Sequence, residues 1–270
     1  MLTFRRRLFL CVALLALSPT LPMNAQSPAA PAVTNADLFE ALEFKGADGE
    51  VLKYRLLKPI DFDAKAKEKY PLVLFLHGAG ERGDDNERQL IWGGKELGDE
   101  TLRRRYPAFV LVPQCPNDAV WAQIRWNGDE AKPDKMSGPL GLSLELIESL
   151  KKEYPIDENR LYAVGLSMGG FGTWDLLERK PGYLAAAVPI CGGGDPKNVG
   201  AYKSTPIWVF HGDADDVIKP ELSREMIAAL KAAGGTPIYT EYPGVGHNSW
   251  SPTFENRGTW DWLFAQRKSD

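Results

Sequence analysis

Short apolar runs alternate with amphipathic stretches through most of the chain, and this alternation is the main structural signal. Apolar runs bounded by Gly, Pro or His predict strands that are buried on both faces. Such runs cover residues 72–76, 109–112, 161–164, 185–190, 207–210 and 238–242. Apolar residues at helical spacing predict helices over residues 140–152, 170–179 and 221–232. The alternation predicts an α/β fold, with a mostly parallel central sheet and helices on both faces.

The segment before these runs has a different pattern. Leu38–Lys45 and Glu50–Leu57 are short strand-like runs separated by Ala47-Asp48-Gly49, so they predict a hairpin. Residues 26–36 are rich in Ala, Pro and Ser and predict a disordered leader. The chain has 270 residues, and we expect residues 37–270 to form a single domain.

The first 25 residues have the form of a secretory signal. Arg5-Arg6-Arg7 is a positive n-region, Leu8–Leu17 is an apolar core, and small residues surround a cleavage point after Ala25. We therefore expect an exported protein, periplasmic or secreted, without stable membrane association after signal cleavage. Two alternatives stay open: Arg6–Leu10 also fits a twin-arginine pattern, and an uncleaved segment would act as an anchor.

Composition excludes one class of partner. The formal net charge is −4, the pI is about 5.6, and acidic and basic residues are interspersed. The run Arg103-Arg104-Arg105 is typical of the solvated end of a helix. We therefore expect no nucleic-acid partner. The sequence does not indicate the oligomeric state.

Gly165-Leu166-Ser167-Met168-Gly169 has the spacing G-x-S-x-G between a predicted strand and a predicted helix. In this context the motif predicts a nucleophile elbow, in which a strained turn exposes the serine and glycines allow the strand and helix to approach closely. We therefore predict Ser167 as a catalytic nucleophile, rather than an idle serine in a glycine-rich turn.

The chain contains three histidines, so the base can be chosen by elimination. His77 and His211 both end an apolar run, precede a Gly, and occupy the same kind of position on two strands. His247 follows the last strand in a glycine-rich loop. Only His247 satisfies the order Ser, acid, His that this kind of site uses. We predict that His247 takes the proton of Ser167.

The acid that orients the base is expected on a loop after a strand, between Ser167 and His247. Asp213, Asp215 and Asp216 follow the strand that ends near residue 210. Spacing alone leaves all three open. A calcium site is disfavoured, because the cluster lacks the longer loop of alternating ligands that such sites use.

Two backbone N–H groups are expected to stabilise a reaction oxyanion. One belongs to Met168, the residue after the nucleophile. The other is expected in His77-Gly78-Ala79-Gly80, where small residues let the backbone approach a substrate oxygen.

With these residues placed, the chain resembles the secreted esterase and predicted-peptidase branch of the α/β-hydrolase superfamily. Phospholipase/carboxylesterases, dienelactone hydrolases and polyhydroxybutyrate depolymerases are related to this branch. The resemblance covers about residues 72–264, and its most specific segments are Leu76–Asp84, Pro113–Pro116, Cys191–Asp195, Phe210–Asp215 and Tyr242–Trp250. It implies an α/β-hydrolase fold, Asp215 as the acid, and Ala79 as the second oxyanion donor.

The resemblance also bears on the two cysteines that follow the signal. In the family's sheet, the strands before Cys115 and Cys191 are separated by two others. Three strand spacings are about 14 Å, and a disulfide needs Cα atoms within roughly 7 Å. We therefore expect both thiols to be unpaired and to pack beneath the site.

A triad of this kind predicts acyl transfer to water, and the leading hypothesis is hydrolysis of small or carbohydrate-linked esters. The family's naming leaves a serine peptidase as an alternative, and a non-catalytic carbohydrate-binding protein on the same fold is a third. Trp126 and Trp250 are candidates for substrate contact, although such aromatics are more often packing residues. The sequence implies no metal or other cofactor.

Overall fold

The computed structural model describes residues 35–65, 67–123 and 135–268. The predicted signal, residues 26–34 of the predicted leader, and Trp126 lie outside the described residues. Asn35 and Ala36, the last two residues of that leader, are described, and a short 3-10 helix starts at Ala36.

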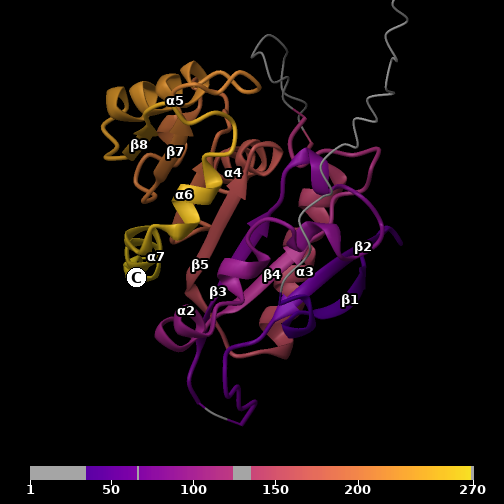
Figure 1. Cartoon of the computed structure of the whole chain (residues 1–270). Helices are drawn as coiled ribbons and strands as arrows, with labels where there is room; N and C mark the ends of the chain where they lie inside the picture. The colour runs from indigo at the N-terminus through magenta and orange to yellow at the C-terminus, as the bar shows by residue number, and fades with distance from the viewer. Residues whose placement is uncertain (1–34, 66, 124–134, 269–270) are drawn as a thin grey trace, which may run out of the picture. The chain divides into compact units, whose positions relative to one another are not determined.

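One twisted sheet organises the described part of the chain, with its eight strands in the order β1-β2-β4-β3-β5-β6-β7-β8 (Figure 1). The strands are β1 Glu40–Lys45, β2 Val51–Leu57, β3 Tyr70–Leu76, β4 Phe109–Pro113, β5 Ile156–Leu166, β6 Ala186–Ile190, β7 Trp208–Gly212 and β8 Ile238–Tyr242. Strand β2 runs against both of its neighbours, and the other neighbouring pairs are parallel. The predicted hairpin is confirmed as β1 and β2, which pair from Glu40↔Leu56 to Lys45↔Val51.

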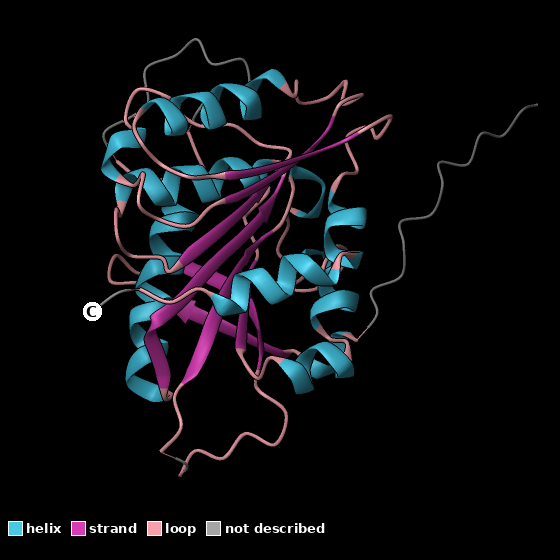
Figure 2. Ribbon diagram, turned by 90° about the vertical axis from the view of Figure 1, so that its left-hand side faces the viewer, coloured by secondary structure: helices cyan, strands magenta, loops and turns pink. Residues whose placement is uncertain are grey.

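Helices cover both faces of the sheet (Figure 2). The α-helices are α1 Gly94–Leu97, α2 Glu100–Arg105, α3 Gly138–Glu153, α4 Met168–Arg179, α5 Glu221–Ala232, α6 Trp250–Glu255 and α7 Arg257–Ala265. Short 3-10 helices are η1 Ala36–Leu38, η2 Ala79–Glu81, η3 Arg88–Leu90 and η4 Val199–Ala201. The predicted mostly parallel sheet with helices on both faces is therefore confirmed.

Two hydrophobic cores lie on the two faces, because successive strand residues point in opposite directions. In β3, Leu72 and Leu74 pack with α3, α4 and α5, whereas Val73 and Phe75 pack with α1, α6 and α7. Every residue of β3 is buried. This burial on both faces explains why its sequence is a continuous apolar run rather than an alternating one.

The topology brings the ends of several strands to one edge of the sheet. Because β3 to β8 are parallel, the loops that leave their carboxyl ends all emerge at this edge. These loops carry the predicted functional segments around residues 77–80, 167, 191, 215 and 247. In the ranges that the structure describes, no helix combines the length and the apolar character needed to cross a membrane.

Candidate active site

Ser167 lies in a sharp turn between β5 and α4. Its backbone has φ 52° and ψ −118°, a positive-φ conformation that residues with a side chain rarely adopt. The turn is held by the Ser167 N–H, which donates to the Ile190 carbonyl over 2.9 Å. Such strain costs about 1–3 kcal/mol and persists only where the surroundings enforce it. The turn has the geometry predicted for a nucleophile elbow.

The two glycines of the motif allow backbones to touch. A Cβ on Gly165 would lie 2.1 Å from the Gly169 carbonyl oxygen. A Cβ on Gly169 would lie 1.9 Å from the carbonyl oxygen of Leu76 in β3. Both contacts are with backbone, which cannot move aside cheaply. The spacing G-x-S-x-G is therefore the packing requirement of this strand-to-helix turn.

His247 reaches Ser167 from the loop after β8. Its Nε2 lies 3.0 Å from Ser167 Oγ, and its Nδ1 lies 2.8 Å from an oxygen of Asp215. The loop is held against the end of β7, where the Ala214 N–H donates to the Val245 carbonyl over 3.0 Å. A Cβ on Gly212 would lie 2.1 Å from that same carbonyl oxygen, so the approach requires a glycine at this position.

The Asp215 carboxylate is fully buried and accepts hydrogen bonds at both oxygens. Oδ1 accepts from the N–H groups of Val217 and Ile218, each over 2.9 Å. Oδ2 lies 2.8 Å from His247 Nδ1 and 3.1 Å from His211 Nε2. A carboxylate with donors on both oxygens has a fixed orientation, with one oxygen directed at His247.

The other two aspartates of the cluster are exposed. Asp213 accepts a hydrogen bond from the Gly244 N–H over 2.6 Å and so tethers the loop that carries His247. The structure brings Asp215, rather than Asp213 or Asp216, together with Ser167 and His247.

The two predicted oxyanion donors stand at the starts of helices. Met168 is the first residue of α4 and Ala79 is the first residue of η2. The first N–H groups of a helix have no acceptor within that helix and carry its positive dipole end. Gly78 lies beside the nucleophile, since a Cβ on it would be 3.6 Å from Ser167 Cβ. Met168 directly follows Ser167, and Ala79 follows the glycine that lies beside it.

His77 fixes the peptide that carries the Ala79 N–H. Its Nδ1 lies 2.6 Å from the Gly78 carbonyl oxygen, and its Nε2 accepts the Cys115 N–H over 2.9 Å. These partners require the tautomer with hydrogen on Nδ1. In a trans peptide the N–H points opposite to the carbonyl, so the Ala79 N–H points away from the buried His77 ring. Burial lowers the pKa of His77 to about 4, which keeps the ring neutral.

Side chains that the motifs did not single out support the same loop. Gln114, buried after β4, donates to the Glu81 carbonyl and to Asp85, and it accepts the Asn86 N–H. Arg82 donates to the Ala79 carbonyl over 3.0 Å. Burial raises the pKa of the Glu81 carboxyl, which hydrogen-bonds the Gly78 backbone and the Trp92 side chain.

The described tryptophans near the site are buried rather than exposed to solvent. Trp250 is 7% exposed, its ring meets His247 edge-on with centroids 5.3 Å apart, and it also contacts the ring of Trp92. Trp121 is fully buried and donates to the His77 carbonyl. Trp250 thus offers little surface for stacking on a substrate, and Trp126 lies outside the described residues.

Cys191 lies beneath the site, and its backbone has φ 39°. Its Sγ, an Asp215 oxygen and a His247 nitrogen lie within 4.8 Å of one another, so these atoms could in principle hold a metal. However, burial raises the pKa of Cys191 to about 12, and the other two groups already bond each other. A protonated thiol is a poor metal ligand. As predicted, Cys115 and Cys191 are free and buried; they follow β4 and β6, which are separated by β3 and β5.

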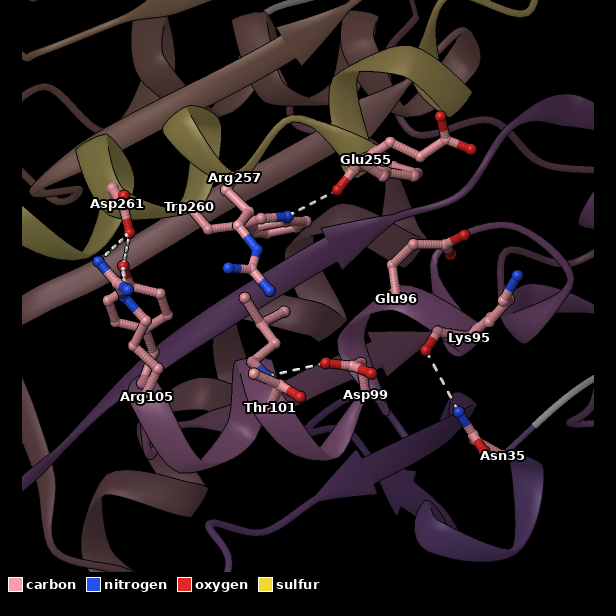
Figure 3. Close-up of a pocket in the computed structure, with 13 residues that line it drawn as sticks. Asn35, Lys95, Glu96, Asp99, Thr101, Arg105, Glu255, Arg257, Trp260 and Asp261 are labelled. Atoms are coloured by element: carbon pink, nitrogen blue, oxygen red, sulfur yellow. Dashed lines mark hydrogen bonds and ion pairs between the residues drawn. The ribbon is translucent and has the colours of Figure 1, made fainter.

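A separate cavity of about 510 Å³ lies between α1 and α2 on one side and α6 and α7 on the other (Figure 3). Arg257 projects into it, and Arg105 at its rim pairs with Asp261 over 3.0 Å. Its described lining residues do not include Ser167, Asp215 or His247. Its described lining carries charges of both signs.

Sequence comparison identifies relatives of the chain. The profile of the dienelactone hydrolase family matches residues 118–256. A bifunctional acetylxylan esterase/xylanase of Neocallimastix patriciarum is 40% identical over 151 residues, which cover 55% of this chain and 20% of that protein. The carboxylesterase SOBER1 of Arabidopsis thaliana is 28% identical over 193 residues, 65% of this chain and 82% of that one.

A solved structure that resembles the chain is also that of an esterase. A thermostable esterase superimposes with a TM-score of 0.80 and 42% sequence identity, covering 87% of this chain and 64% of that chain. The chain therefore spans about a fifth of the xylan-active relative and just under two thirds of the esterase of known structure.

Proposed function

Because this chain belongs to the dienelactone hydrolase family, within the α/β-hydrolase superfamily, we propose that it is a serine hydrolase of carboxylic esters. In this proposal Ser167 is the nucleophile, His247 the base, and Asp215 the acid that orients the base. The backbone N–H groups of Ala79 and Met168 form the oxyanion hole, and residues 37–270 form one catalytic domain.

The observation that carries this proposal is the continuous hydrogen-bonded relay of these three side chains. Ser167 Oγ is 3.0 Å from His247 Nε2, and His247 Nδ1 is 2.8 Å from Asp215 Oδ2. Because the buried carboxylate accepts the Nδ1–H, the neutral ring carries its hydrogen on Nδ1. The lone pair of Nε2 then faces the serine hydroxyl. A serine in this position can lose its proton as it attacks.

In the acylation step, Ser167 Oγ attacks the ester carbonyl carbon while His247 Nε2 takes its proton. The carbonyl π electrons move to oxygen, and the N–H groups of Ala79 and Met168 stabilise the resulting oxyanion. Collapse of the tetrahedral intermediate breaks the bond to the alcohol oxygen. His247 returns its proton to that oxygen, which leaves an acyl group on Ser167.

Deacylation repeats these movements with water. His247 removes a proton from water as its oxygen attacks the acyl carbon, and the same two N–H groups stabilise the second oxyanion. Collapse then returns the proton to Ser167 Oγ and releases the carboxylic acid. Asp215 accepts the His247 Nδ1–H throughout and stabilises the transient imidazolium.

We propose small or carbohydrate-linked esters as the substrate class. The acetylxylan esterase relative supports carbohydrate-linked acetyl esters, and the carboxylesterase and the thermostable esterase support carboxylic esters in general. Stacking of a sugar on Trp250 is not required in this proposal, because the triad and the oxyanion donors hold the reacting atoms.

The test compares the protein with Ser167→Ala on p-nitrophenyl acetate, p-nitrophenyl octanoate and acetylated xylan. We expect the acetate to be the better p-nitrophenyl ester, and acetate to be released from the xylan. The variant is expected to lose about 10⁴-fold or more of the turnover. Labelling of Ser167 by a fluorophosphonate, absent in the variant, would identify the nucleophile directly.

The other hypotheses are outcomes of the same test. Cleavage of aminoacyl p-nitroanilides with no ester turnover would indicate a peptidase. Xylan binding that is equal in both proteins, with no turnover or labelling in either, would indicate a carbohydrate-binding protein. Either result would overturn the esterase proposal.

We further propose that the protein is exported, as the pattern of residues 1–25 indicates. A secreted protein of Arthroderma benhamiae, 25% identical over 239 residues, supports this. Sequencing the N-terminus of protein recovered from the periplasm or the medium is expected to give Gln26. Protein that remains in the cytoplasm with its first 25 residues intact would contradict export.

A further inference from the structure

His211, the second strand-end histidine, contacts the proposed acid directly. It lies in β7 and is fully buried. Its Nε2 lies 3.1 Å from Asp215 Oδ2 and 2.9 Å from the Ile218 carbonyl oxygen. Its Nδ1 lies 2.7 Å from the hydroxyl of Ser223 in α5. Because His211 precedes the acid in the chain, it was not chosen as the base. It also takes part in no step of the proposed mechanism.

These partners determine where the His211 proton lies. A carbonyl oxygen can only accept, so Nε2 carries hydrogen and donates to Ile218 and Asp215 together. Burial lowers the pKa of His211, which favours the neutral ring. The Ser223 oxygen lies 2.7 Å from Nδ1 and 3.0 Å from the Gly192 carbonyl oxygen, so its one proton is shared between the neutral Nδ1 and that carbonyl.

Asp215 Oδ2 is therefore shared by two imidazole N–H groups, one from His211 and one from His247. A donor on a carboxylate oxygen disperses part of its negative charge. The charge that remains on Oδ2 stabilises the imidazolium of His247 during the reaction. A second donor on that oxygen thus holds the carboxylate in place and also weakens its pull on the His247 proton.

We propose that His211 is a positioning residue, which directs Asp215 Oδ2 at His247 and sets how readily His247 takes a proton. This inference rests on the proposed function, because it assigns His211 a role in the same Ser-His-Asp site.

The other charged groups near His211 do not take over its contact with Asp215. Glu241 of β8 lies opposite His211 in the sheet register, but Arg224 of α5 pairs with it over 2.7 Å. Cys191, after β6, faces Asp215 as a neutral thiol, since burial raises its pKa to about 12. Among the described residues, Asp215 has two ring donors, His211 and His247, and two backbone donors, the N–H groups of Val217 and Ile218.

A matched pair of variants isolates the contact. His211→Gln places an amide donor near the position of Nε2 and so retains the bond to Asp215. His211→Asn places its amide near Nδ1, which retains the Ser223 contact and removes the donor on Asp215. Both variants replace a ring by an amide, so they share the loss of ring packing.

The measurement is the pH profile of kcat/KM on p-nitrophenyl acetate. For His211→Asn we expect a fall of about 10–100-fold, because the acid is no longer held in position. The pH midpoint of the rise in activity should move upward by about one unit, since more charge remains on Oδ2. His211→Gln should restore a midpoint close to that of the unmodified protein.

Equal midpoints in all three proteins would overturn the proposal, whatever the rates, because a role in packing alone lowers the rate without shifting the profile.

Nitrogen-15 NMR of the histidines gives a readout that needs neither activity nor a folded variant. The chain has three histidines, and His211 of the unmodified protein should show the tautomer with hydrogen on Nε2. A ring protonated only on Nδ1, or on both nitrogens at neutral pH, would also overturn it. Failure of the proposed function would appear separately, as full activity in Ser167→Ala.

Discussion

At the scale of single residues, the three aspartates after β7 differ in environment more than in sequence. Asp215 is buried and accepts hydrogen bonds from two backbone N–H groups and two imidazoles. Asp216 is exposed, and Asp213 is exposed and holds the Gly244 N–H. A negative charge can orient His247 only where the protein holds it at Nδ1.

Replacing each aspartate by asparagine tests this difference. In Asp215→Asn the side chain keeps its shape but stabilises the wrong tautomer of His247, so kcat should fall by about 10³–10⁴-fold. Asp216→Asn is the matched control and should retain kcat within a few-fold. Steady-state kinetics on one ester is sufficient, and similar losses in both variants would refute the assignment of the acid.

At the scale of elements, the turn from β5 into α4 depends on glycine for contact rather than for flexibility. Gly169, within α4, lies where a Cβ would be 1.9 Å from the Leu76 carbonyl oxygen. Gly141, within α3, has nothing within 4 Å of a built Cβ. Both are helical glycines, so alanine would improve the helix propensity of each by about 1 kcal/mol.

The two substitutions should therefore have opposite effects on stability. Gly141→Ala should raise the free energy of unfolding by up to about 1 kcal/mol. Gly169→Ala should lower it by about 3 kcal/mol or more, because β3 and α4 must separate. Urea unfolding followed by circular dichroism measures both, and a stable Gly169→Ala protein would show that the elbow tolerates displacement of α4.

The elements that could be predicted from the sequence are those whose burial is reflected in a regular pattern of apolar residues. Strands buried on both faces appear as apolar runs, and the bounds expected for α5 and β8 match the structure. Helices α6 and α7 were not predicted, because their aromatic and β-branched residues favour helix weakly and are held by burial of Phe254 and Trp260. The start of β5 was also missed, since Asp157 and its neighbours are charged and are held by ion pairs with Arg160 and Arg267.

Within the site, sequence order was sufficient to nominate Ser167 and His247, because chain order restricts the base. Motif spacing could not separate Asp215 from its neighbours, and the resemblance was needed to favour it. The contacts of His211, Gln114 and Trp92 could not be predicted, since each joins side chains from different loops and elements. These supporting residues follow from the order of the strands in the sheet rather than from local pattern.

At the scale of the whole molecule, the sheet order keeps the two thiols apart. Burial raises the pKa of both Cys115 and Cys191 to about 12. Protein produced without residues 1–25 should show no rapid reaction with Ellman's reagent when native, and two thiols per chain after denaturation. Fewer than two thiols in the denatured protein would indicate a disulfide or oxidation, and rapid native reaction would contradict the burial.

The two buried strand-end histidines make the stability of the whole fold depend on pH. Burial lowers the pKa of His77 to about 4 from the ordinary 6.5, and it also lowers the pKa of His211. Between these values the unfolded chain binds a proton that the folded protein does not, so stability falls as the pH decreases from about 6.5 toward 4. For His77 alone the loss approaches about 3 kcal/mol at pH 4. Stability from this source is fully present above pH 6.5.

Urea unfolding at several pH values between 7 and 4.5 should therefore show the free energy of unfolding decreasing with falling pH. Glu81 acts in the opposite direction, because its pKa is raised in the folded protein. Comparison with His77→Gln cancels this term, since the glutamine variant retains Glu81 and loses one titrating group. The difference between the two slopes should correspond to about one proton over this range. Equal slopes would mean that His77 takes up its proton in the folded protein, and that the bond from its Nδ1 to Gly78 does not depend on a neutral ring.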